Sequence, residues 1–367
     1  MGLTDTSLLI ILTFLTMLTF ILTILIWPKF APQSIFNVFK RILSLFITQV
    51  LLLASVGVAV NNYGGFYGSW SELLGINSNS SMSQANLTSL DSIKTIDANV
   101  LKKAQFSKNG SAIMNLDIFG NVSKETGQVW IVLPKSAVNK IKKGNSDLSK
   151  YRVIQFLPGF PGTPAIWFKR LDIQNKLEMA QKAKNLPPVI GIFTETNLKN
   201  GFDGECLDNP GGPLIETWLT TDVHNYMDKW LKLSQKRWGI IGISAGGWCA
   251  AMIALRHPGK YLAGASIAGY FTSEPSKSLK QAVRKKLLKE YDLRQTIKKN
   301  RPDVSIFATL SPSDRGSYFQ TAHFVADEKN NLKINTFPLT IQGHNFSAWL
   351  PAITPALNWF GGEFKKI

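Results

Sequence analysis

The chain opens on two long apolar stretches, at residues 8–27 and 42–60, neither of which contains a charged side chain. Each approaches the roughly 20 apolar residues that a helix needs to cross a bilayer. The pattern therefore predicts an N-terminal membrane hairpin, residues 1–70, with two transmembrane helices. A cleaved signal peptide is the alternative for the first stretch, but Asp5 stands where such a peptide carries basic residues.

Basic residues flank these stretches on one side only. Lys29, Lys40 and Arg41 lie between them, whereas the residues just after the second stretch carry no basic group. By the positive-inside rule the intervening segment is cytoplasmic, so we expect a cell-membrane protein whose remaining chain lies outside. The next segment, residues 71–104, is rich in Ser, Asn, Thr and Lys with little periodicity, which predicts a flexible linker.

From residue 105 to residue 367, short apolar runs alternate with amphipathic stretches. Strands are predicted at 112–119, 128–133, 151–157, 188–193, 238–243, 262–268, 304–310 and 333–341. Helices are predicted at 173–184, 220–236, 248–255 and within 349–359. This alternation predicts one α/β domain with a mostly parallel sheet and helices on both faces. Reactive groups of such a sheet are expected at the carboxyl ends of its strands.

One predicted strand ends in the sequence Gly242-Ile243-Ser244-Ala245-Gly246-Gly247, and an alanine-rich helix follows at once. In α/β-hydrolases a G-x-S-x-G sequence makes a tight strand-to-helix turn, because the two glycines have no Cβ to collide with neighbouring backbone. The turn exposes the serine, and the helix start directs N–H groups and its positive dipole end toward an oxyanion. Ser244 is therefore the candidate nucleophile.

A serine nucleophile needs a neutral imidazole as general base. The chain has four histidines. His224 and His323 lie within predicted helices, and His257 ends the helix after the serine, roughly 20 Å away at 1.5 Å per residue. His344 directly follows the last strand, which fits the chain order Ser, acid, His of this fold. We predict His344 as the base.

The carboxylate that orients the base is predicted to be Asp314, which follows the strand at 304–310 on the productive edge. Asp303 begins that strand and is expected at the opposite edge. Asp327 and Glu328 fall in the next connection and are weaker candidates. The alternative role for Asp314 is to cap the turn that follows it.

Two backbone N–H donors for the developing oxyanion complete the arrangement. One is predicted at Ala245, the residue after the nucleophile. The other should come from a Pro/Gly-rich loop after an earlier strand, where Pro158 and Pro161 have no N–H and Phe160 is preferred over Gly159. A turn without a catalytic part is the alternative for this loop.

These motifs resemble, in matching order, those of the putative-esterase branch of the α/β-hydrolases, which includes esterase D and the mycolyltransferase antigens. The matching motifs are LPGFPG at 157–162, Glu205-Cys206-Leu207-Asp208, GISAGG at 242–247 with His257-Pro258, and Gly343-His344 followed by Trp349. The two-span N-terminus resembles that of membrane-anchored actinobacterial members. The resemblance implies an α/β-hydrolase fold after two transmembrane helices. It also implies these roles: Ser244 nucleophile, His344 base, Asp314 acid, Phe160 and Ala245 oxyanion donors.

The two cysteines favour a disulfide, because their number is even and the predicted compartment is oxidising. Cys249 lies on the helix after the serine, and Cys206 lies in the loop after the strand expected nearby. A Cys206–Cys249 bridge is expected over two buried thiols. Neither cysteine has a second cysteine or a histidine at ligand spacing, so we predict no metal and no cofactor.

Basic residues give a formal net charge of +17 and concentrate at 277–301, where an apolar residue recurs every four positions. This predicts an amphipathic helix between two strands, where hydrolases often insert a lid. A solvated helix face is the ordinary interpretation. Contact with anionic lipid headgroups is the functional alternative. Nucleic acid is not expected as a partner outside the membrane.

Together these features predict a membrane-anchored, extracytoplasmic serine esterase. It would act on acyl esters of envelope lipids or glycolipids through an acyl-enzyme on Ser244. An acyltransferase with the same triad is the first alternative, since a sugar or lipid hydroxyl can replace water. A catalytically silent envelope-binding protein is the second, because a fold does not guarantee activity.

Overall fold

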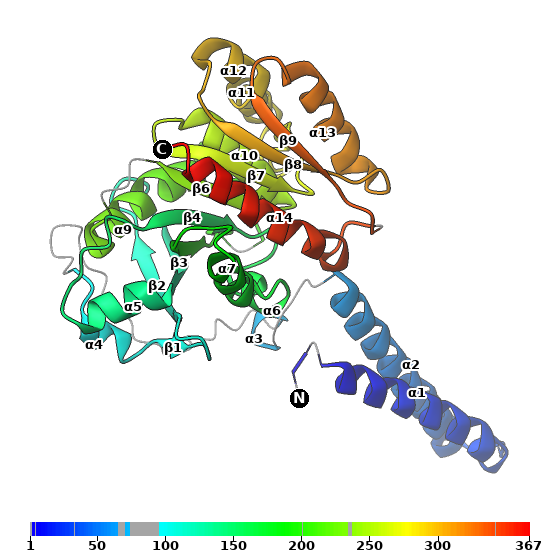
Figure 1. The fold of residues 1–367 in the computed structure, drawn as a ribbon. Coiled ribbons are helices and arrows are strands. Elements are labelled where there is room, and N and C mark those ends of the chain that lie inside the picture. The colour runs from blue at the N-terminus through cyan, green and yellow to red at the C-terminus, as the bar shows by residue number, and fades with distance from the viewer. Residues whose placement is uncertain are drawn as a thin grey trace. The chain divides into compact units, whose positions relative to one another are not determined.

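The computed structural model describes the chain except residues 1, 4, 33, 65–69, 74–94, 200, 234–236 and 342. It divides into two compact units, Met1–Asn79 and Ser80–Ile367, and each is described by itself (Figure 1). Most of the linker predicted at 71–104 lies outside the described residues.

The first unit is a helical hairpin. Helix α1 (Thr6–Ile26) is followed by the 3-10 turn η1 (Trp27–Phe30), helix α2 (Ile35–Gly64) and the short helix α3 (Trp70–Leu73). The two long helices are apolar enough to cross a membrane, with mean hydropathies of 2.8 and 2.3. A signal sequence near an N-terminus has the same property. Between the helices, the hydroxyl oxygens of Thr16 and Ser55 lie 3.2 Å apart.

The second long helix begins earlier than predicted. Because α2 starts at Ile35, Lys40 and Arg41 lie on its first turns and not in the connection between the helices. The Arg41 guanidinium donates to the carbonyl of Phe30 and lies 5.7 Å from the Trp27 ring. Hydropathy marks only the apolar part of a helix, whereas the hydrogen-bonded helix continues into polar turns. The basic residues still lie at the turn of the hairpin.

The second unit contains one sheet. Its nine described strands lie in the order β1-β2-β3-β5-β4-β6-β7-β8-β9. Their bounds are β1 (Gln105–Phe106), β2 (Ala112–Phe119), β3 (Thr126–Leu133), β4 (Arg152–Leu157), β5 (Val189–Thr194), β6 (Trp238–Ile243), β7 (Tyr261–Ile267), β8 (Ser305–Leu310) and β9 (Lys333–Pro338). The pairs from β1 through β3 to β5 are antiparallel, and the pairs from β5 through β4 to β9 are parallel. The predicted α/β-hydrolase class, with a mostly parallel sheet, is confirmed.

Helices cover both faces of this sheet (Figure 1). They are α4 (Ala98–Leu101), α5 (Lys135–Lys142), α6 (Ala165–Lys169), α7 (Ile173–Lys182), α8 (Ile215–Thr217), the π-helical turn η3 (Trp218–Asp222), α9 (Val223–Leu231), α10 (Ala245–Arg256), α11 (Gln281–Glu290), α12 (Leu293–Asn300), α13 (Arg315–Glu328) and α14 (Phe346–Phe364). Apolar residues of α7 and α14 pack on one face of the central strands, and those of α9 and α10 pack on the other. Because successive strand residues point to opposite faces, fully buried strands such as β6 serve both layers.

Two of the helices predicted in this unit differ from the helices observed. Residues 277–301 form two helices, because the Asp292 side chain caps α12 by accepting from the N–H groups of Arg294 and Gln295. The two helices connect β7 to β8. They pack on the core, because Leu287 and Tyr291 are buried. The helix predicted at 220–236 is preceded by α8 and η3, and its regular part ends at Leu231.

The last ten residues of the segment predicted as a flexible linker, 95–104, belong to the α/β unit. Ile96 is fully buried, and its N–H donates to the carbonyl of Trp230 at 2.9 Å. Asp97 caps α4 by accepting from two backbone N–H groups. The polar composition of this segment concealed the two apolar side chains, Ile96 and Leu101, that reach the core.

Candidate active site

Ser244 lies at the strand-to-helix turn between β6 and α10. Its backbone has φ 53° and ψ −124°, and its N–H donates to the carbonyl of Ile267 at 2.9 Å. A Cβ on Gly242 would lie 1.8 Å from the carbonyl oxygen of Gly246, and one on Gly246 would lie 2.4 Å from that of Pro158. Both distances are far shorter than any contact between a carbon and an oxygen that are not bonded to each other, so this turn requires glycine at both positions.

The side chains of Ser244, His344 and Asp314 form a continuous hydrogen-bonded series. Ser244 Oγ lies 2.7 Å from His344 Nε2, and His344 Nδ1 lies 2.6 Å from Asp314 Oδ2. They come from three different loops, which follow β6, β9 and β8. The parallel strands bring these loops to the same edge of the sheet. The His344 side chain is 41% exposed and that of Asp314 is 11% exposed, so a substrate can approach the imidazole while the carboxylate stays covered.

The loop that carries His344 is held on both sides. The N–H of Gly343, which has φ +97°, donates to Ser313 Oγ at 3.3 Å. The His344 ring packs edge to face against Trp349, with centroids 4.9 Å apart. Ser313 and Asp314 are neighbours in the loop after β8. This loop therefore orients the imidazole twice, through Ser313 on the Gly343 N–H and through Asp314 on His344 Nδ1. Neither of these contacts follows from the sequence pattern of the two loops.

The carboxylates considered as alternatives to Asp314 pair with residues other than His344. Asp303 is exposed at the start of β8 and pairs with Arg237 and Lys333. Asp327 accepts from Arg294 on a neighbouring helix.

The other histidines also lie outside the hydrogen-bonded series. His224 is buried and stacks on Trp238, with ring centroids 3.6 Å apart. His257 Nε2 lies 2.7 Å from Glu216. His323 is exposed on α13.

The two predicted oxyanion donors lie beside the serine. A Cβ on Gly159 would lie 3.1 Å from Ser244 Cβ, which shows how closely the loop after β4 approaches the nucleophile. Phe160, which follows it, and Ala245, the first residue of α10, line one small cleft together. Their N–H groups donate no hydrogen bond within the described part of the chain. They are thus available to an oxyanion.

Cys206 and Cys249 are joined in a disulfide, with Cα atoms 5.7 Å apart. It attaches the loop after β5 to α10, one turn beyond the serine. The indole of Trp248 donates to the carbonyl of Glu205 at 3.1 Å, and the Tyr270 hydroxyl donates to the Glu205 carboxyl. Burial raises the pKa of Glu205 to about 8, despite hydrogen bonds that lower it. A disulfide indicates an extracytoplasmic location.

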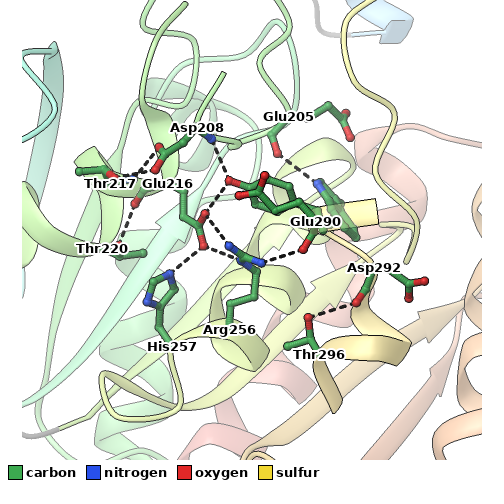
Figure 2. Close-up of polar contacts among 12 residues, drawn as sticks. Glu205, Asp208, Glu216, Thr217, Thr220, Arg256, His257, Glu290, Asp292 and Thr296 are labelled. Carbon is green, nitrogen blue, oxygen red and sulfur yellow. Dashed lines mark hydrogen bonds and ion pairs between the residues drawn. The ribbon is translucent and has the colours of Figure 1, made fainter. Parts of the chain in front are cut away.

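A second polar cluster, around Glu216, lies at the far end of α10. Figure 2 shows the side chains of Arg256 and His257 pointing toward Glu216, with contacts of 2.7 Å each. The Tyr291 hydroxyl donates to Glu216 and accepts from the N–H of Asp208. These contacts lower the pKa of Glu216 to about 2, although burial acts against them. The sequence pattern did not indicate this cluster, because its members come from four separate segments.

Thr196 and Asn197 were also missed. Both follow β5 and line the cleft that contains Phe160 and Ala245. The amide of Asn197 donates to the carbonyl of Gly162 at 2.9 Å, which supports the loop after β4. The rule that selected Asp314, that functional groups follow strands at the carboxyl edge, would have found them as well. Among the described residues, no group of three or more His, Cys, Asp or Glu is arranged to hold a metal ion.

Comparisons with known proteins concern the α/β unit. The profile of the family described as Putative esterase matches residues 124–360. An uncharacterized protein of Corynebacterium glutamicum is 22% identical over 226 residues, which cover 56% of this chain and 52% of that protein. The chain thus spans about half the length of this curated relative.

Solved structures share the fold. A ferulic acid esterase matches with a TM-score of 0.59 and 20% identity, over 69% of this chain and 99% of the esterase. A fluorophosphonate-binding serine hydrolase of Staphylococcus aureus matches with a TM-score of 0.55 and 14% identity, over 68% and 98%. At these identities the likeness concerns the fold, and the chemistry must be argued from the residues themselves.

Proposed function

This chain belongs to the Putative esterase family, and from that premise we propose that it is a serine esterase that forms an acyl-enzyme on Ser244. The hydrogen-bonded series from Ser244 Oγ through His344 to Asp314 carries the proposal. Its geometry meets the distances that a nucleophile, a base and an orienting acid require. A silent binding protein would have no need to keep three loops in this register.

The reaction begins when Ser244 Oγ attacks the ester carbonyl carbon while His344 Nε2 takes its proton. Asp314 accepts from Nδ1–H of His344, which holds the ring with Nε2 unprotonated and stabilises the imidazolium that forms. The oxyanion accepts from the N–H groups of Ala245 and Phe160. Loss of one such donor costs about 2.7 to 4 kcal/mol of transition-state stabilisation.

The tetrahedral intermediate then expels the alcohol, which takes the proton from His344. Water attacks the acyl-enzyme with His344 again as base, and the acid leaves. An acceptor hydroxyl in place of water gives acyl transfer with the same residues.

We further propose that the enzyme is anchored in the cell membrane and acts outside it on acyl esters of lipids or glycolipids. Two apolar helices near the N-terminus, with basic residues at the turn between them, support this orientation. The disulfide supports the compartment. A tether to a bilayer keeps the site near lipid-borne esters, which favours this substrate class.

Labelling with a fluorophosphonate probe tests the nucleophile. We expect the natural protein and a Ser278→Ala control to be labelled, and Ser244→Ala to be unlabelled. Asp314→Asn should remain folded but lower kcat on an aryl ester by about 10⁴, because the wrong imidazole tautomer is then favoured. Equal labelling of Ser244→Ala, or none of the natural protein, would reject the proposal.

Product partition separates hydrolysis from transfer. The unlabelled natural enzyme is given an aryl ester with and without an added sugar or glycerolipid acceptor. Free acid as the sole product in both cases would establish hydrolysis. An acylated acceptor would establish transfer.

A further inference from the structure

A small cleft lies beside the serine turn, between the proposed oxyanion donors and the loop after β5. Its lining includes Phe160 and Ala245 and, from the loop after β5, Thr196, Asp203 and Glu205. The space is about 10 Å³, which is roughly the room that one water molecule or one hydroxyl group needs. An acyl chain does not fit. The cleft opens next to the place that the ester carbonyl oxygen would occupy.

One hydroxyl that lines this cleft, that of Thr196, makes no hydrogen bond within the part of the chain that the structure describes. Thr196 as a whole residue is only 7% exposed, but its hydroxyl oxygen is accessible. Its neighbours are engaged: Asn197 donates to Gly162, and Asp203 Oδ1 accepts from the N–H of Glu205. The Thr196 hydroxyl is therefore available to donate to, or accept from, a polar group of a ligand.

The part of the cleft that the loop after β5 forms is held in place. Glu205 and Cys206 both have positive φ, 54° and 57°, a conformation that side-chain residues rarely adopt unless surrounding contacts enforce it. The disulfide, the Trp248 indole and the Glu274 N–H, which donates to Glu205 at 2.9 Å, keep it there. The cleft is thus formed before substrate binds.

The charge of the wall favours a neutral ligand. Burial raises the pKa of Glu205 to about 8 and also raises the pKa of Asp203. The Glu205 carboxyl is therefore mostly protonated at pH 7, so the cleft does not present the two carboxylates that would attract a cation. A neutral hydroxyl can both donate and accept here.

We propose that this cleft is a specificity subsite for a substrate hydroxyl group carried near the ester carbonyl, with Thr196 as its hydrogen-bonding partner. The inference rests on the proposed esterase function and refines its substrate class. A substrate with a hydroxyl group at this position gains a hydrogen bond to Thr196 that a substrate without one lacks, so the cleft discriminates between the two. The hydroxyl can belong to the acyl chain or to the alcohol, because both are attached to the carbonyl carbon.

Two substrate pairs distinguish these sources. The first pair is 4-nitrophenyl butyrate and 4-nitrophenyl 3-hydroxybutyrate, which differ in the acyl chain. The second is propyl butyrate and glycerol 1-monobutyrate, which differ in the alcohol. The full-length enzyme in detergent should prefer the hydroxylated member of at least one pair in kcat/KM. Thr196→Val should reduce that preference about fivefold to tenfold, and Thr196→Ser should restore it.

The plain esters show whether the variant is folded and whether the catalytic residues still work. Thr296→Val, a substitution on α12 of a threonine whose hydroxyl bonds to the Asp292 carbonyl, is the matched control and should keep every ratio. An equal loss on plain and hydroxylated esters in Thr196→Val would assign Thr196 a structural role and overturn the subsite. Unchanged ratios would overturn it as well. Absence of hydrolysis and of probe labelling in the natural protein would instead reject the esterase proposal, and this inference with it.

Discussion

At the residue scale, the site depends on backbone conformations that side-chain residues rarely adopt. Ser244, Glu205, Cys206 and Ala268 all have positive φ. Each is held by a specific bond: Ser244 by the Ile267 carbonyl, Ala268 by Thr309 Oγ1 at 2.6 Å, and the other two through the disulfide and its neighbours. Strain of this kind persists where surrounding contacts over-determine it, and it gathers at functional sites. It places the serine, the oxyanion donors and the cleft wall together.

Glu205 gives a test of this arrangement through pH. Its folded-state pKa is raised from 4.5 to about 8, so the unfolded chain releases this proton first as pH rises. The carboxyl therefore costs the folded state increasing free energy from pH 4.5 up to about 8, on the order of a few kcal/mol. We expect Glu205→Gln to unfold at higher denaturant concentration than the natural protein at pH 8, and at a similar one at pH 4.5.

A control for this measurement is Glu290→Gln on α11, whose side chain is exposed and whose charge does not contribute to the raised pKa of Glu205. Its unfolding midpoint should follow the natural protein at both pH values. A stabilisation of Glu205→Gln that is equal at pH 4.5 and pH 8 would contradict an ionisation effect, because it would reflect packing alone.

At the element scale, α10 is held at both ends. Its N-terminal turn carries the disulfide, and its C-terminal end carries Arg256 and His257, which meet Glu216 of α8. Tyr291, between α11 and α12, joins the same carboxylate. The long segment between β5 and α9 is thus attached near both ends of α10. Figure 2 shows the attachment of Glu216 to Arg256 and His257. This attachment keeps the helix start, and with it the Ala245 N–H, in register with the serine.

Glu216 should therefore make stability depend on acid pH. Its pKa is lowered from 4.5 to about 2, so its contribution is complete above pH 4.5 and is lost as pH falls toward 2. That difference corresponds to about 3 kcal/mol. We expect Glu216→Gln to lower the free energy of unfolding by this order at pH 7, and the gap from the natural protein to narrow at pH 3. Chemical denaturation followed by tryptophan fluorescence measures both.

The matched control is Glu290→Gln on α11, whose side chain is exposed. It should change the free energy of unfolding by less than about 0.5 kcal/mol. A constant gap between Glu216→Gln and the natural protein from pH 7 to pH 3 would show that the carboxylate charge does not stabilise the cluster.

At the scale of the whole molecule, a polar and basic α/β unit is joined to an apolar hairpin. The two have opposite solvent requirements: the side chains of α1 and α2 are mostly exposed within the hairpin unit, whereas the α/β unit buries its apolar residues in two layers. Apolar helices with this much uncovered surface need a bilayer or another apolar partner.

We expect the protein to remain in the membrane fraction after alkaline carbonate washing and to be released by detergent. Its N-terminal sequence should be retained, because the proposed anchor is not cleaved. Protease added to intact cells should digest the α/β unit. Release by carbonate, or a mature N-terminus beyond residue 27, would indicate a signal sequence in place of an anchor.

Several features of the site could be predicted because their causes are local. The serine turn follows from collisions that any Cβ at Gly242 or Gly246 would cause, and those depend on neighbouring residues in the chain. The strand-by-strand position of His344 and Asp314 follows from the rule for parallel sheets. The break at Asp292 was also local, since an aspartate cap precedes α12, but the apolar period across 277–301 obscured it.

Other features depended on distant parts of the chain. Ile96 is buried because the backbone of Trp230 accepts its N–H and the core of the sheet accepts its side chain. The Glu216 cluster and the cleft that Thr196 lines each arise where four segments of the chain meet. Neither a hydrophobic period nor a short sequence motif indicates contacts between segments that are far apart in the chain.

The sequence by itself determined the fold class, the apolar hairpin, the serine turn and the order in which the predicted nucleophile, acid and base follow one another along the chain. Hydrophobic period and glycine sterics act between near neighbours, so they can be read in order. Only the tertiary structure decided the distances among Ser244, His344 and Asp314, the elements that α10 is tied to, and the small polar cleft beside it. Those depend on packing between segments far apart in the chain, because burial and hydrogen-bond pairing are properties of the assembled molecule.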